Sequence, residues 1–343
     1  MARVRSPDFV AFVDQTNSLG DKRQVYSGFM KTKTIYSVLA VFFCSVFTLM
    51  GEVKVYETDS LFSDLGSDGK GAIVMVHFGT THDDTRALTL DALNALVKEA
   101  YPGLEVREAY TSRIVMKRLG ARGIVKLSPR ETLLALKEEG FTHLLIQPTQ
   151  VIDGVEMESL RRDVAPFLKD FKEIRIGTQL LDRLEDYKAL AESMTAGGDS
   201  AAARLWVGHG TYDVSTAQYC MLDYVLRDMG FGHHVITTIE GYPGLEEGLR
   251  RLRETGRKRV ILSPLLIVSG EHAKNDIAID VKRRLEAEGY EVALDLRGLG
   301  EYSGVRKLFL DKIKFTAGHR KIDIMRKKKI YAVTGEKLTD GEE

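Results

Sequence analysis

The feature that most constrains the fold of this chain is an internal repeat of alternating strand and helix signals, beginning at Gly71. The apolar run Ala72–Val76 ends in a glycine turn and is followed by a helical pattern over 84–100, and Arg204–Val207 repeats this plan before a helical pattern over 215–229. Further strands are expected at 104–109, 144–147, 234–238, 259–262 and 291–294, and further helices at 113–119, 129–139, 244–255 and 272–288. Strands that alternate with helices of this length predict an α/β fold with parallel sheets covered by helices on both faces.

The repeat is also visible in the letters. VHFGT (76–80) aligns with VGHGT (207–211), and LIQPTQVIDGVEMES (145–159) aligns with ILSPLLIVSGEHAKN (261–275). A duplicated unit of about 120 residues therefore predicts two similar α/β domains. We place them at 70–195 and 204–318, with a boundary in the small-residue stretch 196–203, a linker at 52–69 and a basic, polar tail at 319–343. Ligands of parallel sheets bind at the carboxyl ends of the strands, so we expect a cleft between the two domains.

The composition excludes several classes of protein. Lys+Arg and Asp+Glu both number 49 in 343 residues, so the formal net charge is zero and nothing favours a nucleic-acid partner. A hydrophobic content of 44% excludes wholesale disorder. Two cysteines, Cys44 and Cys220, cannot build a disulfide framework or a cysteine-based zinc site.

The first 51 residues contain a segment with the layout of a secretory signal. Lys31 and Lys33 precede a charge-free run over 35–50, which ends before Gly51. We interpret 1–51 as a leader and signal peptide, with Met30 as an alternative start, and expect a periplasmic or otherwise exported protein with no stable membrane insertion after cleavage. A retained signal anchor stays open because the cleavage pattern is poor, and a misread start would leave the protein in the cytoplasm. The run is short for a membrane span, which needs about 20 residues.

Where the two repeats differ, they carry polar side chains that we expect to face the cleft. His209 takes the place of Phe78, and Glu156 takes the place of His272. Two imidazoles and one carboxylate form a suitable ligand set for a divalent transition metal, with coordination positions left open. Each residue also has an ordinary reading, as a turn, helix-start or solvated surface residue; their matched positions in a repeat favour function.

The other histidines are weaker candidates. His77 and His82 flank the first Gly-Thr turn. They are either secondary metal contacts or, more simply, solvent-facing loop residues. His233 and His234 are expected to be structural. The glycine turns match neither Gly-x-Gly-x-x-Gly nor Gly-Lys-Ser, so the sequence does not support nucleotide use.

Six short pieces, in order, carry a resemblance to a known family. They are HFGTT (77–81), YTSR (110–113), IDGVEMES (152–159), VGHG (207–210), IEGYP (239–243) and SGEHAKND (269–276). Over roughly residues 70 to 318 the chain resembles the anaerobic sirohydrochlorin cobaltochelatases, which are ATP-independent tetrapyrrole chelatases of cobalamin biosynthesis, and its leader resembles an exported subset of that family. The resemblance implies two α/β domains around a cleft, with His209 and His272 binding the metal and Glu156 as the third ligand.

The resemblance also implies a reaction, the insertion of Co²⁺ into sirohydrochlorin without ATP. One of the two imidazoles would accept a pyrrole proton as the metal transfers, and the sequence does not decide which. Because the substrate carries eight carboxylates, cationic and N–H contacts are expected, with two aromatic rings packing on the macrocycle. The candidate contacts are Phe78, Gly79, Thr80, Ser112, Arg113, Gly210, Thr211 and Tyr242.

Several alternatives stay open. The ligand set does not separate Co²⁺ from Fe²⁺ or Ni²⁺, so an iron-inserting chelatase for sirohaem or haem is one alternative. An exported protein that binds metal or haem without turnover is another. The chain departs from the family pattern at Gln150, where a histidine is common, and no haem-ligating histidine can be matched. The tail containing Arg326–Lys329 is expected to be a solvated or frayed end, and a homo-oligomer is neither required nor excluded.

Overall fold

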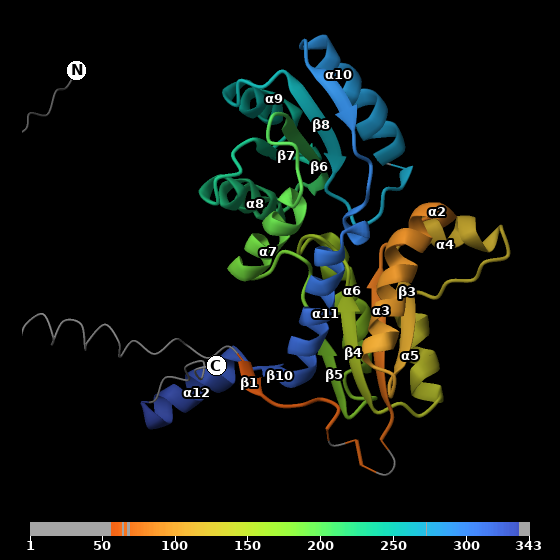
Figure 1. Cartoon of the computed structure of the whole chain (residues 1–343). Coiled ribbons are helices and arrows are strands. Elements are labelled where there is room, and N and C mark those ends of the chain that lie inside the picture. Colours follow the sequence, from red (N-terminus) through yellow and green to blue (C-terminus); the bar gives the residue numbers. More distant parts are fainter. Residues whose placement is uncertain (1–55, 64, 67–68, 272, 336–343) are drawn as a thin grey trace, which may run out of the picture.

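The computed structural model describes residues 56–63, 65–66, 69–271 and 273–335. They form two α/β lobes, each built on a four-stranded parallel sheet, and a small two-stranded sheet joins the two ends of the described chain (Figure 1). The leader, the signal-like run and His272 lie outside the described residues. Among the described residues, no helix is long and apolar enough to cross a bilayer.

The first sheet has the order β3-β2-β4-β5, with all neighbours parallel. Its strands are β2 (Gly71–His77), β3 (Glu105–Tyr110), β4 (His143–Pro148) and β5 (Glu173–Ile176). Every residue of β2 is buried, as expected for a central strand of a parallel sheet with helices on both faces. The helices of this half are α2 (Asp83–Arg86), the π-helical η1 (Ala87–Asp91), α3 (Ala92–Ala100), α4 (Arg113–Gly120), α5 (Pro129–Glu138), α6 (Val155–Val164), η2 (Ala165–Phe167) and α7 (Leu184–Thr195).

The second sheet repeats the first, with the order β7-β6-β8-β9. Its strands are β6 (Ala203–Thr211), β7 (His234–Gly241), β8 (Arg259–Pro264) and β9 (Glu291–Leu294). The accompanying helices are η3 (Val214–Thr216), α8 (Ala217–Asp228), α9 (Leu245–Glu254), η4 (Ala273–Val281), α10 (Lys282–Ala287), η5 (Leu299–Glu301) and α11 (Ser303–Gly318). The same strand order in both lobes confirms the predicted duplication and the predicted α/β class.

Helix α11 departs from the sequence-based division into domains. Its residues were assigned to the second domain, yet the helix packs against β4 and β5 of the first sheet (Figure 1). Lys312 on α11 donates a 2.7 Å hydrogen bond to Asp186 on α7, with both side chains buried. The repeat could not reveal this crossing, because internal similarity aligns the units and says nothing of which lobe covers a connecting helix.

One apolar cluster runs through both lobes. It joins Ile73 and Met75 of β2 to Trp206 of β6, and Leu190 of α7 and Phe309 of α11 belong to the same cluster. Separate clusters cover the other face of each sheet, with Val74 in the first lobe and Leu205 in the second. The two lobes therefore share a core on the α7 and α11 side.

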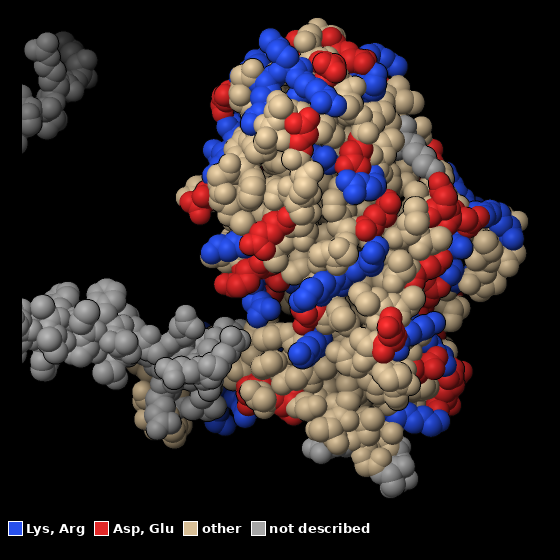
Figure 2. Space-filling view, viewed as in Figure 1, with Lys and Arg blue, Asp and Glu red and all other residues tan. Residues whose placement is uncertain are grey.

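The described part of the tail, residues 319–335, forms a strand and a helix where a solvated or frayed end was expected, and Arg326, Lys328 and Lys329 are exposed to solvent, as expected. Strand β1 (Tyr56–Thr58) pairs antiparallel with β10 (His319–Lys321), and helix α12 (Ile324–Thr334) follows. Asp323 caps α12 by accepting hydrogen bonds from the backbone N–H groups of Met325 and Arg326. On the face shown in Figure 2, Lys and Arg are interspersed with Asp and Glu over both lobes, in keeping with the zero net charge.

Candidate active site

A cavity of about 870 Å³ lies between the lobes, at the carboxyl ends of the strands. The first lobe contributes the segments after β2, β3 and β4, and the second contributes the end of β6 and the segment after β8. This is the position predicted from the repeat. Its volume is within the usual range for a small-molecule site, about 300–1,000 Å³.

The cavity brings together most of the residues selected from the sequence. Those that line it are Phe78, Gly79, Thr80, Ser112, Glu156, His209, Gly210 and Thr211. Phe78 is 50% exposed, so its ring is available to a ligand.

Two of the predicted substrate contacts, Arg113 and Tyr242, are not among the residues that line the cavity, and their contact with substrate stays a prediction. Arg113 begins α4, and the residues of that helix that line the cavity are Ile114, Val115 and Arg118. At 100° per residue these three share one arc of the helix, and Arg113 lies outside it. On this helix the cation at the cavity wall is therefore that of Arg118. Tyr242 is half exposed at the end of the β7 segment, where its carbonyl accepts a hydrogen bond from the Thr216 hydroxyl.

His209 is presented to the cavity by its two glycine neighbours. A Cβ on Gly208 would lie 2.6 Å from the Tyr219 ring, and Gly210 has φ +86° with its Cβ position 1.7 Å from the carbonyl oxygen of Glu240. Side chains at either position would push the strand away from its neighbours. The Nδ1 atom of His209 lies 3.2 Å from the carbonyl oxygen of Gly210.

Glu156 is placed in the first turn of α6, whose N-cap is Gly154. Its side chain is half-buried at the cavity wall, and a carboxylate is favourable at a helix N-terminus. Asp213, Glu240 and Glu271 also line the cavity.

The remaining residue of the predicted metal set, His272, lies outside the described residues. Its neighbours Gly270 and Glu271 line the cavity. Across the ranges that the structure describes, no three His, Cys, Asp or Glu side chains are grouped closely enough to hold one metal ion. The metal roles of His209, His272 and Glu156 therefore stay predictions.

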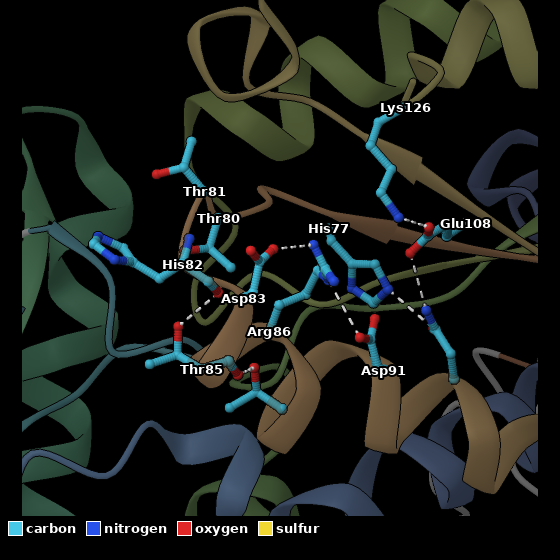
Figure 3. A network of polar contacts seen from close by, with 12 residues as sticks. His77, Thr80, Thr81, His82, Asp83, Thr85, Arg86, Asp91, Glu108 and Lys126 are labelled. Carbon is cyan, nitrogen blue, oxygen red and sulfur yellow. Dashed lines mark hydrogen bonds and ion pairs between the residues drawn. The ribbon is translucent and has the colours of Figure 1, made fainter. Parts of the chain in front are cut away.

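An ion pair crosses the cleft beside this position. Nε2 of His82, in the first lobe, lies 3.2 Å from Oε2 of Glu271, in the second. Figure 3 shows His82 extending away from the His77 network, toward the second lobe. The hydrogen bond from His82, with a further one from Asn275, lowers the pKa of the Glu271 carboxyl. Glu271, which precedes η4 (Ala273–Val281) by two positions, is thus tied to the loop that follows β2.

His77 is fully buried, so both predicted roles, a secondary metal contact and a solvent-facing loop residue, are wrong. Its Nδ1 lies 3.0 Å from the Thr149 hydroxyl and its Nε2 lies 3.0 Å from Oδ1 of Asn94, which itself donates to Glu108 (Figure 3). Burial lowers the pKa of His77 and keeps the imidazole neutral. His77 therefore positions the loops after β2 and β4. The sequence could not reveal this, since a strand-end histidine can point to either side of the chain.

His234 is structural, as predicted. It is buried and accepts a 3.1 Å hydrogen bond from the Trp206 indole N–H. Burial, with the nearby His233 as a smaller cause, lowers its pKa to about 3.

Sequence reasoning missed an apolar rim and an acidic residue. Ile114, Val155 and Tyr212 line the cavity with 67%, 59% and 83% of their surface exposed. Glu240 lies beside the end of β6, since it pairs with Gly210 in the β6–β7 register. The available signals were the positions of Tyr212, directly after the Gly-His-Gly-Thr turn, and of Glu240, within IEGYP (239–243).

Comparison with known proteins decides the family. The profile of the cobalt chelatase (CbiK) family matches residues 71–318, which include both lobes. The chain belongs to the CbiK family of metal chelatases.

Two curated relatives agree with this assignment. A sirohydrochlorin cobaltochelatase of Salmonella typhimurium is 30% identical over 249 residues, covering 70% of this chain and 94% of the relative. The sirohydrochlorin cobaltochelatase CbiKC of Nitratidesulfovibrio vulgaris is 33% identical over 254 residues, covering 71% of this chain and 89% of the relative.

A solved structure agrees at the level of the fold. SirB from Bacillus subtilis with Fe³⁺ superposes with a TM-score of 0.53 at 17% identity, covering 72% of this chain and 96% of that one. The CbiK-family assignment, the two lobes and the cavity between them are thus in agreement.

Proposed function

We propose that this CbiK-family protein is a sirohydrochlorin cobaltochelatase that inserts Co²⁺ into the macrocycle without ATP. The observation that carries the proposal is the inter-lobe cavity, which places His209 and Glu156 on its wall beside the start of the helix that follows Glu271. The names of two curated relatives with about a third of their residues identical support the substrate and the metal.

The residues around the cavity can handle a divalent cation. His209 and His272 are the proposed nitrogen ligands, and Glu156 is the proposed oxygen ligand; Co²⁺ enters as a substrate and leaves within the product. Neutral imidazole binds such ions, and a set without thiolates suits an ion that must be released. Glu240 gives a second choice of carboxylate, because it lies in register with Gly210, next to His209.

Metal insertion also removes two N–H protons from the macrocycle. An imidazole that holds its proton with a pKa near 6.5 can accept one of them at neutral pH. His209 and His272 are the proposed acceptors. In this proposal the bases are residues of the cavity and no nucleotide takes part.

The walls suit a flat ligand with an acidic edge. Phe78 and Ile114 of the first lobe and Tyr212 of the second supply apolar surface for the ring faces. Arg118 and the N–H groups of the two Gly-Thr turns are the proposed contacts for the substrate carboxylates. Export of the protein, with the signal-like segment either removed or retained as an anchor, is part of the proposal and rests on the sequence of residues 30–51 alone.

The proposal is tested by turnover. Sirohydrochlorin and Co²⁺ are supplied anaerobically, without ATP, in about 50-fold excess over the protein, and the absorbance of the cobalt product is followed. Many equivalents of product per protein are expected, as for an enzyme with an ordinary kcat. One equivalent or less of bound metal with no product would instead show a binding protein, and faster conversion with Fe²⁺ or Ni²⁺ would change the assigned metal.

A further inference from the structure

The two ends of the described chain meet at one corner of the molecule, away from the cavity. Tyr56 of β1 pairs with Lys321 of β10, and Arg326 on α12 forms a 3.0 Å ion pair with Glu57 on β1. Figure 1 shows β1 (orange) beside β10 and α12 (blue), with α12 extending away from both lobes. Helix α12 is therefore fixed next to the point where residues 1–55 join the described part of the chain.

The segment 319–334 is basic in a chain with no net charge, with six Lys and Arg side chains against the carboxylate of Asp323. Arg320 pairs with Asp59 and Glu173, and Arg326 pairs with Glu57, so the exposed lysines Lys321, Lys328 and Lys329 carry most of the positive charge offered to a partner. Lys328 and Lys329 are exposed on α12. Such a cluster is attracted to an anionic surface.

The same helix leaves apolar side chains in water. Ile324, Met325, Tyr331 and Val333 are 60%, 66%, 53% and 79% exposed. A three-turn helix with this many exposed apolar groups is unusual on a soluble surface. Exposed apolar groups beside long cationic side chains suit a lipid interface, where the ammonium groups reach the headgroups.

The sequence outside the described residues favours a membrane as the anionic partner of α12. The charge-free run 35–50 ends six residues before Tyr56, a distance of at most about 22 Å in an extended chain. A bilayer entered by that run would lie within reach of α12, whose 11 residues span about 16 Å.

We propose that the run 35–50 is retained as a membrane anchor and that α12 lies on an anionic phospholipid surface beside it. The strand pair β1–β10 would then hold the two lobes at a fixed position against the membrane. This inference does not depend on the proposed cobalt chemistry, since none of its residues lines the cavity.

A tryptophan probe tests the proposal on the full chain. Trp206 is the only native tryptophan and is fully buried, so Tyr331→Trp adds one reporter at the helix. With phosphatidylglycerol vesicles carrying brominated acyl chains, strong quenching of the added fluorescence is expected. Val125→Trp is the matched control, because Val125 is 79% exposed in the first lobe, and its probe is expected to stay unquenched.

The charge requirement is tested with Lys328→Gln/Lys329→Gln in the Tyr331→Trp background. The vesicle concentration for half-maximal quenching is expected to rise on the order of 30-fold, whereas the exposed pair Lys98→Gln/Lys188→Gln leaves it unchanged. Quenching equal to that of Val125→Trp would overturn the proposal. A concentration-dependent dimer with no lipid quenching would also overturn it and assign the helix to a second copy of the chain.

Discussion

His209 stands between two glycines whose missing side chains leave room for Tyr219 on one side and for the Glu240 carbonyl on the other. The spacing Gly-His-Gly thus has a steric cause in addition to any chemical one. The histidine side chain is exposed at the end of a buried strand because its neighbours carry no side chain of their own.

The glycine argument is checked by two matched substitutions. Gly210 and Gly230 both have φ +86°, but only Gly210 has a neighbour where Cβ would lie, since nothing is within 4 Å at Gly230. Gly230→Ala is expected to cost about 1 kcal/mol of stability, and Gly210→Ala at least about 3 kcal/mol. Urea unfolding measures both, and equal losses would show that the contact with Glu240 is not tight.

The choice between the two carboxylates is also a question about single residues. Glu156→Gln keeps size and shape while removing the charge, so it should lower kcat/KM for cobalt insertion at least about 10-fold. Glu240→Gln is the comparison, with a smaller expected loss. If Glu240→Gln has the larger effect in steady-state assays, the third metal ligand is Glu240.

Two buried histidines make stability depend on pH. Burial lowers the pKa of His77, and that of His234 falls to about 3, so the unfolded chain, with ordinary values near 6.5, binds more protons than the folded one. Their contribution is complete above pH 6.5 and is lost as the pH falls toward the folded values. His234 alone should remove about 1.4 kcal/mol between pH 7.5 and 5.5. Urea midpoints at the two pH values test this, and a His234→Phe protein should show a shallower dependence.

At the scale of elements, the sequence predicted most strands of the two sheets and most of the helices that connect them. Apolar runs such as Ala72–Val76 are buried on both faces, so the sequence of the run alone identifies it as a strand. The strand Glu173–Ile176 was missed because charged residues alternate with its isoleucines, and Arg175 is buried through ion pairs with Glu173 and Asp59. Such compensation appears only in three dimensions.

Helix α11 shows the same limit. Its contact with α7 includes a buried lysine, Lys312, a residue type normally assigned to the surface. Here burial lowers the pKa of Lys312, and the carboxylate of Asp186 opposes that shift. The candidate site was predictable to the extent that it follows strand ends; Arg118, Glu240 and Tyr212 were missed because their roles depend on which lobe faces them.

Removal of the buried ammonium should destabilise the protein. Lys312→Met leaves Asp186 buried without its partner, and a loss of about 3–5 kcal/mol is expected. Lys307→Met on the same helix is the control, since Lys307 is 73% exposed and its substitution should stay within about 0.5 kcal/mol. Comparable losses in thermal or urea unfolding would mean that the Lys312–Asp186 pair contributes nothing specific to the α7–α11 contact.

At the scale of the whole molecule, the two lobes share a core on one side and enclose the cavity on another. Residues from 78 to 271 meet there because both sheets direct the carboxyl ends of their strands toward the same space. The duplication therefore explains the position of the cavity. The proposed ligands His209 and Glu156 come from different lobes, so neither lobe alone carries the whole proposed metal set.

The most direct test of this account is a single-turnover assay of cobalt insertion with His209→Ala and His272→Ala. Sirohydrochlorin is bound first, Co²⁺ is added anaerobically, and the rate of product formation is read from the absorbance. Both variants should be slower by at least about 100-fold, because each removes a metal ligand or proton acceptor. His143→Ala, at the amino end of β4, should match the unmodified protein. Unchanged rates in both cleft variants would contradict the central claim that the reaction occurs between the lobes at these two histidines.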